Sequence, residues 1–534
     1  MDVMLNSNKL YIMKKNIYQL GILLMVATIM SSCSDYLDKN PTNSLSQETF
    51  YQSKSDIDMA LTSCYSILKD HEYTTSIAFL DCLADNGYNK DDYWSSMTIS
   101  QGPITPTTGG IGAVYSKSYS RIARYNIFLK ALSEYTDTDI SEEEKIEYEA
   151  EVRMLRGMAY LELYKYYGSV PLVLEPLTYE NQDQPKVDET EIFSQVISDL
   201  DFAIEHLPDV SYRDNNGHLV KTSAQVAKAR ALIYTAYTED GTAKPEVMEQ
   251  VKQITSEIIN TGYYAIGPSY RGLFCDDLGE QTDNPEYIFS VKFVGPHSNA
   301  LSYWDGTPFV VYCQWAGWGE CAPLQNFVEE YEFIDGTAFS EDNPLYDKND
   351  VFKNRDPRMA KTFCSGTITF ENGYTYTIQA ASPTNYTYYK NVTGSNALDP
   401  NSNNLGSDWP AMRYAEVLLM YAEAANEIDG PTQEVHNAIN QIRSRADIQM
   451  PNLPSNLTKD QMRQAIRKER RIELAFEGFR YDDVKRWRIA EERLNMSQVE
   501  GVASRSFEKK NYHWPIPQSE IDKSNGVLVQ NPDY

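Results

Sequence analysis

Four stretches of this chain repeat alanine and large apolar residues at intervals of three and four positions. In a helix this spacing gathers small side chains on one face, where a second helix can approach closely. The pattern therefore favours a mainly α-helical fold of packed helix pairs over a sheet protein. The four stretches cover residues 151–168, 223–237, 413–428 and 462–488.

The stretches are similar to tetratricopeptide-type repeats, so we expect a tetratricopeptide-like helical scaffold. In the first stretch Leu155, Ala159 and Leu163 fall on one stripe, and Gly168 is placed to end the helix. In the second stretch we expect Ser223 to be the N-cap residue.

A long segment from Asp240 to Pro410 separates the second stretch from the third. It is rich in Gly, Pro, Asn, Asp and Tyr, and only short runs such as EYIFSVKFV and GYTYTIQ suggest strands. We therefore expect long loops with small strands. Because binding sites are often built on loops held by a rigid scaffold, this segment and residues 81–119 are the candidate functional regions.

The N-terminal region has the features of a lipoprotein signal peptide. Residues 13–33 read MKKNIYQLGILLMVATIMSSC, in which two lysines precede an apolar run that is too short to span a bilayer. We expect residues 1–32 to be removed and Cys33 to carry the lipid, which would anchor the protein without a membrane-spanning helix. An ordinary signal peptide that ends near a cysteine is the alternative, and the start could be Met1 or Met13.

These observations divide the chain into four predicted segments. They are the signal peptide, an N-terminal part with the first repeats, the irregular insertion and a C-terminal helical part, at residues 1–32, 33–239, 240–410 and 411–534.

The formal charge of −28 argues against binding to nucleic acid.

Besides Cys33 there are six cysteines with no CxxC pair, so we predict no zinc site. In an exported protein some of them could form disulfides, with Cys313 and Cys321 the nearest in sequence, but buried free thiols are an equal alternative. The six are Cys64, Cys82, Cys275, Cys313, Cys321 and Cys364.

Taken together, several segments resemble the SusD/RagB family of surface nutrient-binding lipoproteins. They occur in the order expected for the family and extend over the whole mature chain. Trp514 departs from the pattern, since an aliphatic residue is more usual there. The segments are SDYLDKNPT, LRGMAYLELYKYYGSVPLV, NFVEEYEFIDGT, NRDPRM, RYAEVLLMYAEAANE, IRKERRIELAFEGFRYDDVKRW and WPIPQSEID with QNPDY.

The resemblance implies a helical fold of four tetratricopeptide-like units and an irregular region that carries the ligand site. It also implies a SusC-like TonB-dependent transporter of the outer membrane as partner, for which such proteins act as a lid. The implied ligands are oligosaccharides or, in some members, peptides. The acidic stretch SDYLD after Cys33 resembles the signal for the outer face of the outer membrane.

Flat aromatic side chains bind the apolar faces of sugar rings, so the seven tryptophans were considered one by one. Trp409, Trp487 and Trp514 lie in repeat or turn contexts and are expected to be structural. Glycines flank the pair in QWAGWGE, which favours a loop that presents its rings. The candidate aromatic contacts are Trp94, Tyr303, Trp304, Trp315 and Trp318, with Tyr386, Tyr388 and Tyr389 as weaker ones.

A polar stretch precedes Trp94, and the resemblance places ligand contacts in this neighbourhood. Its Asp and Asn side chains could bind sugar hydroxyls, with a solvated loop as the alternative. The candidates are Asp81, Asp85, Asn86 and Asn89. By contrast, the run RKERRIELAFEG has alternating charges at helix-neighbour spacing, which predicts a solvated, ion-paired face without a ligand.

No nucleophile elbow, phosphate loop, dinucleotide fingerprint or HExxH motif occurs, and we expect no cofactor, no metal and no enzymatic activity. A surface glycosidase would need only two carboxylates and is the less favoured reading. The main alternative to glycan capture is a peptide-binding surface lipoprotein or adhesin that uses the same aromatic residues.

Overall fold

The computed structural model describes residues 51–69, 77–89, 92, 95–275, 283–292, 321–369, 373, 375–377, 384–390, 408–496 and 504–534. By its internal contacts the chain forms two units, the first from Met1–Ile57 with Tyr135–Asp139 and the second from Asp58–Glu134 with Ile140–Tyr534. In the described part of the chain, no helix has the length and apolar character needed to cross a membrane.

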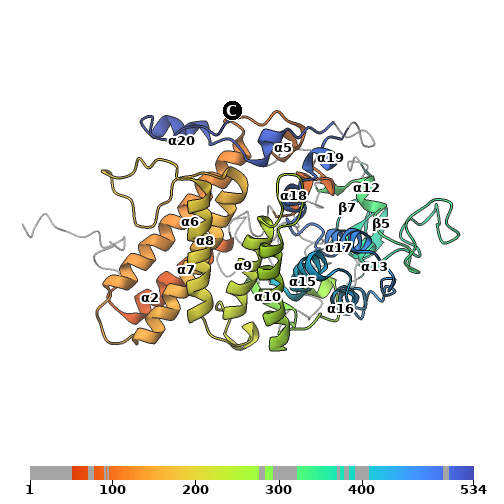
Figure 1. Cartoon of the computed structure of the whole chain (residues 1–534), viewed down its shortest axis with the longest axis horizontal. Helices are drawn as coiled ribbons and strands as arrows, with labels where there is room; N and C mark the ends of the chain where they lie inside the picture. The colour runs from red at the N-terminus through yellow and green to blue at the C-terminus, as the bar shows by residue number, and fades with distance from the viewer. Residues whose placement is uncertain are drawn as a thin grey trace, which may run out of the picture. The chain divides into compact units, whose positions relative to one another are not determined.

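Long helices pack in succession along the chain (Figure 1). Helix α7 packs between α6 and α8, α9 packs between α8 and α10, and α15 packs against α10, α16 and α17. Their bounds are α6 Gly109–Glu134, α7 Glu142–Tyr167, α8 Glu189–His206, α9 Lys221–Tyr234, α10 Pro245–Thr261, α15 Tyr414–Asp429, α16 Gln433–Arg443 and α17 Lys459–Glu473.

The contact between α10 and α15 explains how a helical array tolerates the long insertion. The chain leaves the array after α10 and returns at α15, and these two helices pack directly on each other. The predicted helical stretches are therefore confirmed as α7, α9, α15 and α17, with the fourth stretch divided between α17 and α18 (Arg480–Arg486). The four predicted sequence segments themselves stay predictions.

Local signals account for several helix ends. Ser141 accepts a hydrogen bond from the Glu144 amide at the start of α7, and Gly168 ends that helix at a φ of 67°. The expectation for Ser223 was wrong. Val220 is the N-cap of α9, and Ser223 lies inside the first turn, where its buried hydroxyl donates to the carbonyl oxygen of Ile288 at 2.8 Å.

In its described part the insertion has short strands, as predicted, and they form two-stranded antiparallel pairs with one another, with β1 of the N-terminal part and with β8 at the insertion's end. The pairs are β1 (Gly87–Tyr88) with β3 (Ala322–Pro323), β2 (Tyr287–Val291) with β8 (Trp409–Arg413), β4 (Phe363–Cys364) with β7 (Thr387–Tyr388), and β5 (Thr367–Thr369) with β6 (Thr375–Thr377).

Short helices complete the described elements. They are the α-helices α2 Lys54–Ser66, α4 Ile77–Cys82, α5 Ser96–Gln101, α12 Gln325–Val328, α13 Pro357–Thr362, α19 Ala490–Leu494 and α20 Gln518–Lys523, and the 3₁₀ helices η2 Ile67–Lys69, η4 Tyr212–Asp214, η5 Arg271–Leu273 and η8 Lys509–Tyr512.

Helix α17 corrects the prediction of a solvated charged face, because the charged residues from Glu469 to Glu473 are buried in an ion-pair network. Glu473 accepts from Arg413 at 2.8 Å and from Arg445 at 2.6 Å, and both arginines also bind Glu286. Arg358 binds Glu473 at 3.0 Å. Since Glu286 and Arg358 belong to the insertion, the charges of α17 hold the insertion to the helices.

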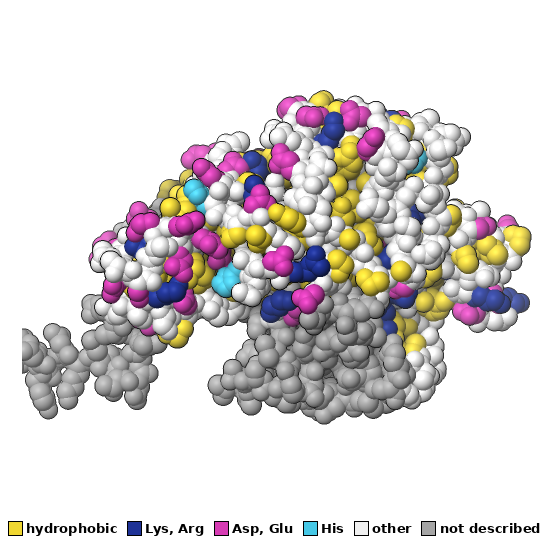
Figure 2. Space-filling model, turned by 90° about the horizontal axis from the view of Figure 1, so that it is seen from below, with side chains coloured by type: hydrophobic (Ala, Val, Ile, Leu, Met, Phe, Trp, Pro, Cys, Tyr) yellow, Lys and Arg dark blue, Asp and Glu magenta, His cyan; other side chains and the backbone are white. Residues whose placement is uncertain are grey.

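The tryptophans predicted to be structural are buried, which confirms that reading: Trp409 is 4% exposed, and Trp487 and Trp514 are 1% exposed. Trp514 stacks on Tyr166 with ring centroids 4.3 Å apart, and its indole N–H donates to the Tyr481 hydroxyl at 3.2 Å. On the face seen in Figure 2, Asp and Glu side chains are spread widely, in keeping with the acidic composition.

Candidate functional site

The polar stretch after α4 does not form an exposed wall. Asp81, Asp85, Asn86 and Asn89 are all at most 2% exposed. Asp85 is held by two arginines of the C-terminal part: Arg480 donates to it through Nε at 2.6 Å and Nη2 at 2.9 Å, and Arg471 Nη2 lies 3.1 Å from its Oδ2. Burial opposes ionisation, but the two guanidiniums outweigh it and hold the pKa of Asp85 well below its usual range.

The neighbouring side chains are also bonded within the protein. Asp81 accepts hydrogen bonds from the Asn86 amide at 2.7 Å and from the backbone N–H of Gly478 at 2.8 Å, and burial raises the pKa of Asp81 to about 6. The Asn86 side-chain oxygen accepts from Arg471 Nε at 2.7 Å. Asn89 donates to the Ser96 hydroxyl at 3.0 Å, while its Oδ1 accepts no hydrogen bond from the described residues.

This burial corrects the reading of the stretch as a solvated loop, while ligand contact by the four side chains stays a prediction. Asp81, Asp85 and Asn86 anchor the segment to Arg471, Gly478 and Arg480. Sequence reasoning missed the two arginines because they lie almost four hundred positions along the chain, at separations of 386 and 395 from Asp85.

The anchored stretch leads into β1, and β1 pairs with β3. Gly87 faces Pro323 and Tyr88 faces Ala322 in an antiparallel register, and the Leu324 amide donates to the Asn86 carbonyl at 3.0 Å. In this register the chain that continues after Tyr88 and the chain that arrives at Ala322 meet at the same end of the pair. On this side the described residues next to the pair are Asn89, which precedes the undescribed residues 90 and 91, and Cys321, which follows the undescribed residues 293–320.

The aromatic candidates Trp94, Tyr303, Trp304, Trp315 and Trp318 lie outside the described residues, as does Cys33. The weaker tyrosine candidates can be placed. Tyr386 and Tyr388 are buried in a hydrophobic cluster with Phe363 and Phe476, and the Tyr389 hydroxyl accepts from Arg271 Nη1 at 3.0 Å. These three tyrosines, which were the weaker ligand candidates, therefore make contacts within the protein.

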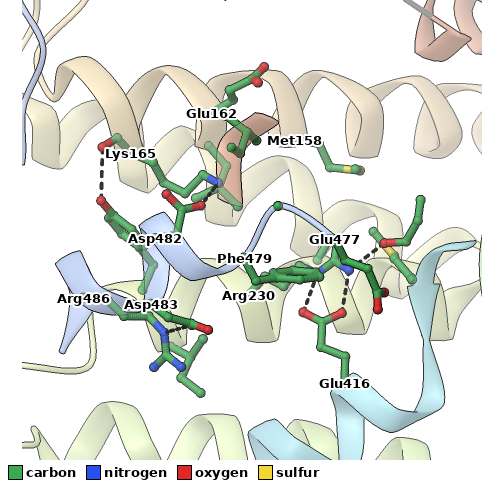
Figure 3. Close-up of a pocket in the computed structure, with 18 of the residues that line it drawn as sticks. Met158, Glu162, Lys165, Arg230, Glu416, Glu477, Phe479, Asp482, Asp483 and Arg486 are labelled. Atoms are coloured by element: carbon green, nitrogen blue, oxygen red, sulfur yellow. Dashed lines mark hydrogen bonds and ion pairs between the residues drawn. The ribbon is translucent and has the colours of Figure 1, made fainter. Parts of the chain in front are cut away.

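A cavity of about 160 Å³ lies among α7, α9, α18 and the β8 strand (Figure 3). Its charged side chains mostly pair with one another: Arg230 holds the Glu416 carboxylate with Nε at 2.8 Å, Lys165 pairs with Asp482, and Arg486 donates to Asp483 at 2.8 Å. The Phe479 ring lies beneath the Arg230 guanidinium at 5.1 Å. Sequence reasoning did not find this cavity, because its lining comes from segments far apart in the chain.

The architecture defines a class of protein: a tetratricopeptide-like array of paired helices, interrupted once by an irregular insertion that is fixed by buried ion pairs. Comparison with known proteins agrees. The profile described as "SusD family" matches residues 285–534, and one described as "Starch-binding associating with outer membrane" matches residues 35–234. The chain belongs to the SusD/RagB family.

Individual relatives span nearly the full length. The SusD-like protein P2 of Formosa agariphila is 24% identical and covers 98% of this chain and 100% of its own. A crystal structure of a SusD-like protein from Bacteroides fragilis has a TM-score of 0.76 at 26% identity and covers 93% of this chain and 100% of its own. A SusD-like carbohydrate binding protein from the same organism has a TM-score of 0.74 at 27% identity, with 90% and 99% covered.

Proposed function

We propose that this protein is a surface-exposed lipoprotein of the outer membrane, anchored at Cys33, that captures oligo- or polysaccharides and delivers them to a SusC-like TonB-dependent transporter. Three features support glycan capture: the family, the description of one matching profile as starch-binding and associating with the outer membrane, and the carbohydrate-binding relative at 27% identity. The anchor follows from the lipoprotein signal at residues 13–33.

The pairing of β1 with β3 is the observation that supports the proposed location of the ligand site. Trp94 follows Asn89 by five residues, and Trp318 precedes Cys321 by three. Because Asn89 and Cys321 lie at the same end of the strand pair, the segments that lead toward these two tryptophans begin next to each other. This adjacency supports the proposal that Trp94 and Trp318 share one ligand surface.

The proposed ligand surface is therefore aromatic and not acidic. Trp94 and the Trp315/Trp318 pair form its walls, with Tyr303 and Trp304 beside them, and they contact the apolar faces of sugar rings. The buried residues Asp81, Asp85 and Asn86 support this surface from beneath and do not touch the ligand. Such a division of roles needs a rigid base, which the ion pairs of Asp85 with Arg471 and Arg480 provide.

Affinity electrophoresis tests this function. The lipid-free chain, residues 34–534, is run through gels that contain a panel of neutral and acidic polysaccharides, together with a Trp315→Ala/Trp318→Ala variant. We expect one glycan to retard the wild-type chain but not the variant. The matched control is Tyr179→Ala, which removes an aromatic side chain that is 85% exposed outside the insertion, and it should migrate like the wild type.

Retardation by no polysaccharide, together with binding of short peptides, would overturn glycan capture in favour of the peptide-binding alternative. Retardation of both the wild type and the double variant would support glycan capture but contradict the assignment of the ligand surface to this tryptophan pair. Loss of folding in the double variant, seen as a lower Tm, would assign Trp315 and Trp318 to the core.

A further inference from the structure

Two cysteines that are distant in sequence meet beside the β1–β3 pair. Cys82 is the last residue of α4, and Cys321 directly precedes β3. Their thiols hydrogen-bond to each other. Both belong to one hydrophobic cluster, in which Cys82 is 1% and Cys321 0% exposed. No sequence motif marks this contact, because the residues between them form most of the first helices and half of the insertion.

The surrounding backbone is shaped to let the two residues approach. A Cβ at Gly87 would lie 3.0 Å from the Cys82 sulfur and 2.9 Å from the Phe476 ring, so only glycine leaves room for the thiol against the strand. Cys321 has a φ of 52°, in the left-handed region that non-glycine residues adopt only when the surroundings hold them there.

Other described cysteines have different surroundings. The Cys275 thiol donates to the carbonyl oxygen of Lys390 at 3.6 Å, and the Cys364 thiol donates to that of Thr387 at 3.9 Å. Cys64 is buried next to Arg124 and Glu151. Cys82 and Cys321 thus differ from these cysteines in that their two sulfurs bond to each other, and such a contact is the starting point for a disulfide.

We propose that Cys82 and Cys321 are oxidised to a disulfide when the exported chain folds. The two thiols lose two protons and two electrons, and one S–S bond forms between them. The oxidant is a protein disulfide of the thiol-oxidase class found outside the cytosol, and it is reduced to two thiols in exchange. The proposal rests on export of the chain and not on what the chain binds.

Burial sets the time at which the bond can form. Desolvation and the hydrogen bond to Cys321 raise the pKa of the Cys82 thiol far above its ordinary value, so in the folded protein it is protonated and shielded from an attacking disulfide. Oxidation therefore takes place before the cluster around Phe476 closes. Once formed, the bond is equally shielded from reductants.

The disulfide would join α4 to β3 across a loop of roughly 240 residues, and long loops give a cross-link its largest effect on the unfolded chain. It would also fasten β1 beside β3 covalently. The two chain segments that lead to Trp94 and away from Trp318 would then stay adjacent even when the two-residue strands open.

Peptide mapping under non-reducing conditions tests the proposal. The full chain is exported with its own signal peptide, denatured, alkylated without reductant, digested and analysed by mass spectrometry. We expect the Cys82 and Cys321 peptides to be linked, and the Cys64, Cys275 and Cys364 peptides to be alkylated. A Cys313–Cys321 link, or full alkylation of both Cys82 and Cys321, would overturn the proposal.

Thermal unfolding gives a second, independent readout. Dithiothreitol added to the denatured exported protein before refolding should lower its Tm by roughly 5 °C, and a Cys82→Ala/Cys321→Ala variant should show no such response. Cys364→Ala is the matched control, since it removes another buried thiol of the same cluster region and should keep the full response. An unchanged response in the double variant would contradict the proposal, whatever its own Tm.

Discussion

The carboxylate of Asp85 is held side-on by the guanidinium of Arg480, with Nε–Oδ1 and Nη2–Oδ2 distances of 2.6 and 2.9 Å, although 395 positions separate the two residues. Arg471 binds the same carboxylate from α17. This bidentate pair connects the segment before β1 to the last helices of the array. It fixes the base on which we place the aromatic ligand surface.

Asp85→Asn should destabilise the protein strongly. The change leaves the buried Arg480 guanidinium without its carboxylate partner and leaves Arg471 with Glu330 alone, and breaking a buried pair in this way typically costs about 3–5 kcal/mol. Urea unfolding followed by circular dichroism measures the loss. The control is Asp209→Asn, whose side chain is 55% exposed and pairs with Lys221 at 2.9 Å; its loss should be about 1 kcal/mol or less. If Asp85→Asn lost glycan affinity at unchanged stability, Asp85 would be a ligand contact after all.

Gly87→Ala should weaken the junction of β1 and β3. The new methyl group would overlap the Phe476 ring and the Cys82 sulfur, and overpacking of this kind costs about 1–3 kcal/mol. Gly112→Ala in α6 is the control, because the nearest atom to a Cβ at Gly112 belongs to Pro517 and is 3.9 Å away. Alanine should therefore fit there and stabilise the helix by about 1 kcal/mol. Equal effects of the two changes on the urea midpoint would show that the close approach at Gly87 has no consequence.

Trp514→Ala should cost about 3–5 kcal/mol of unfolding free energy, because it empties a site between Tyr166 and Tyr481 in the buried core. The change should leave glycan affinity unaltered in whatever fraction stays folded. Denaturant unfolding and retardation in a polysaccharide gel measure the two quantities separately. A variant that is fully stable but no longer retarded would mean that Trp514 belongs to the ligand surface.

Acid should weaken the protein through Glu423. Burial disfavours its charge, but Arg486, Arg470 and a hydrogen bond from Trp487 prevail and lower its pKa to about 2 from an ordinary value near 4.5. A depressed carboxyl pKa stabilises the fold above pH 4.5, and this contribution is lost as the pH falls toward 2.

The measurement compares urea midpoints of the wild type and Glu423→Gln at pH 7 and pH 3. The stability gap between them should narrow by about 2 kcal/mol at pH 3, since Glu423 then binds a proton in the unfolded wild-type chain but stays ionised in the folded one, whereas the variant has no titrating group there. A gap that is constant with pH would show that Glu423 is not the titrating group.

The helices could be predicted from sequence because their signal is local. The alanine spacing within residues 151–168 and 413–428 reports which face of each helix is packed, whatever it packs against. The charged run of α17 failed for the opposite reason. The same periodicity fits a solvated face equally well. The face is buried because it contacts an ion-pair network that includes Glu286, Arg358 and Arg413, which are distant in sequence.

The candidate site shows the same limit. Asp85 and Asn86 were singled out as polar groups near an aromatic residue, but whether such a group meets a ligand or an arginine depends on long-range contacts that no local pattern reveals. The adjacency of Asn89 and Cys321 likewise depends on two residues of β1 and two of β3. The meeting of Cys82 with Cys321 was equally hidden, and sequence proximity had pointed to Cys313 instead.

The most direct test is a double-mutant cycle on glycan affinity with Trp94→Ala and Trp318→Ala, measured by isothermal titration with the polysaccharide that retards the wild type. We predict that each single change raises Kd about tenfold or more, because each removes a ring that contacts the same ligand, while Tm shifts by no more than about 2 °C. Wild-type affinity in either single variant would contradict a shared surface at the end of the β1–β3 pair, as would a loss of binding that occurs only with a loss of folding.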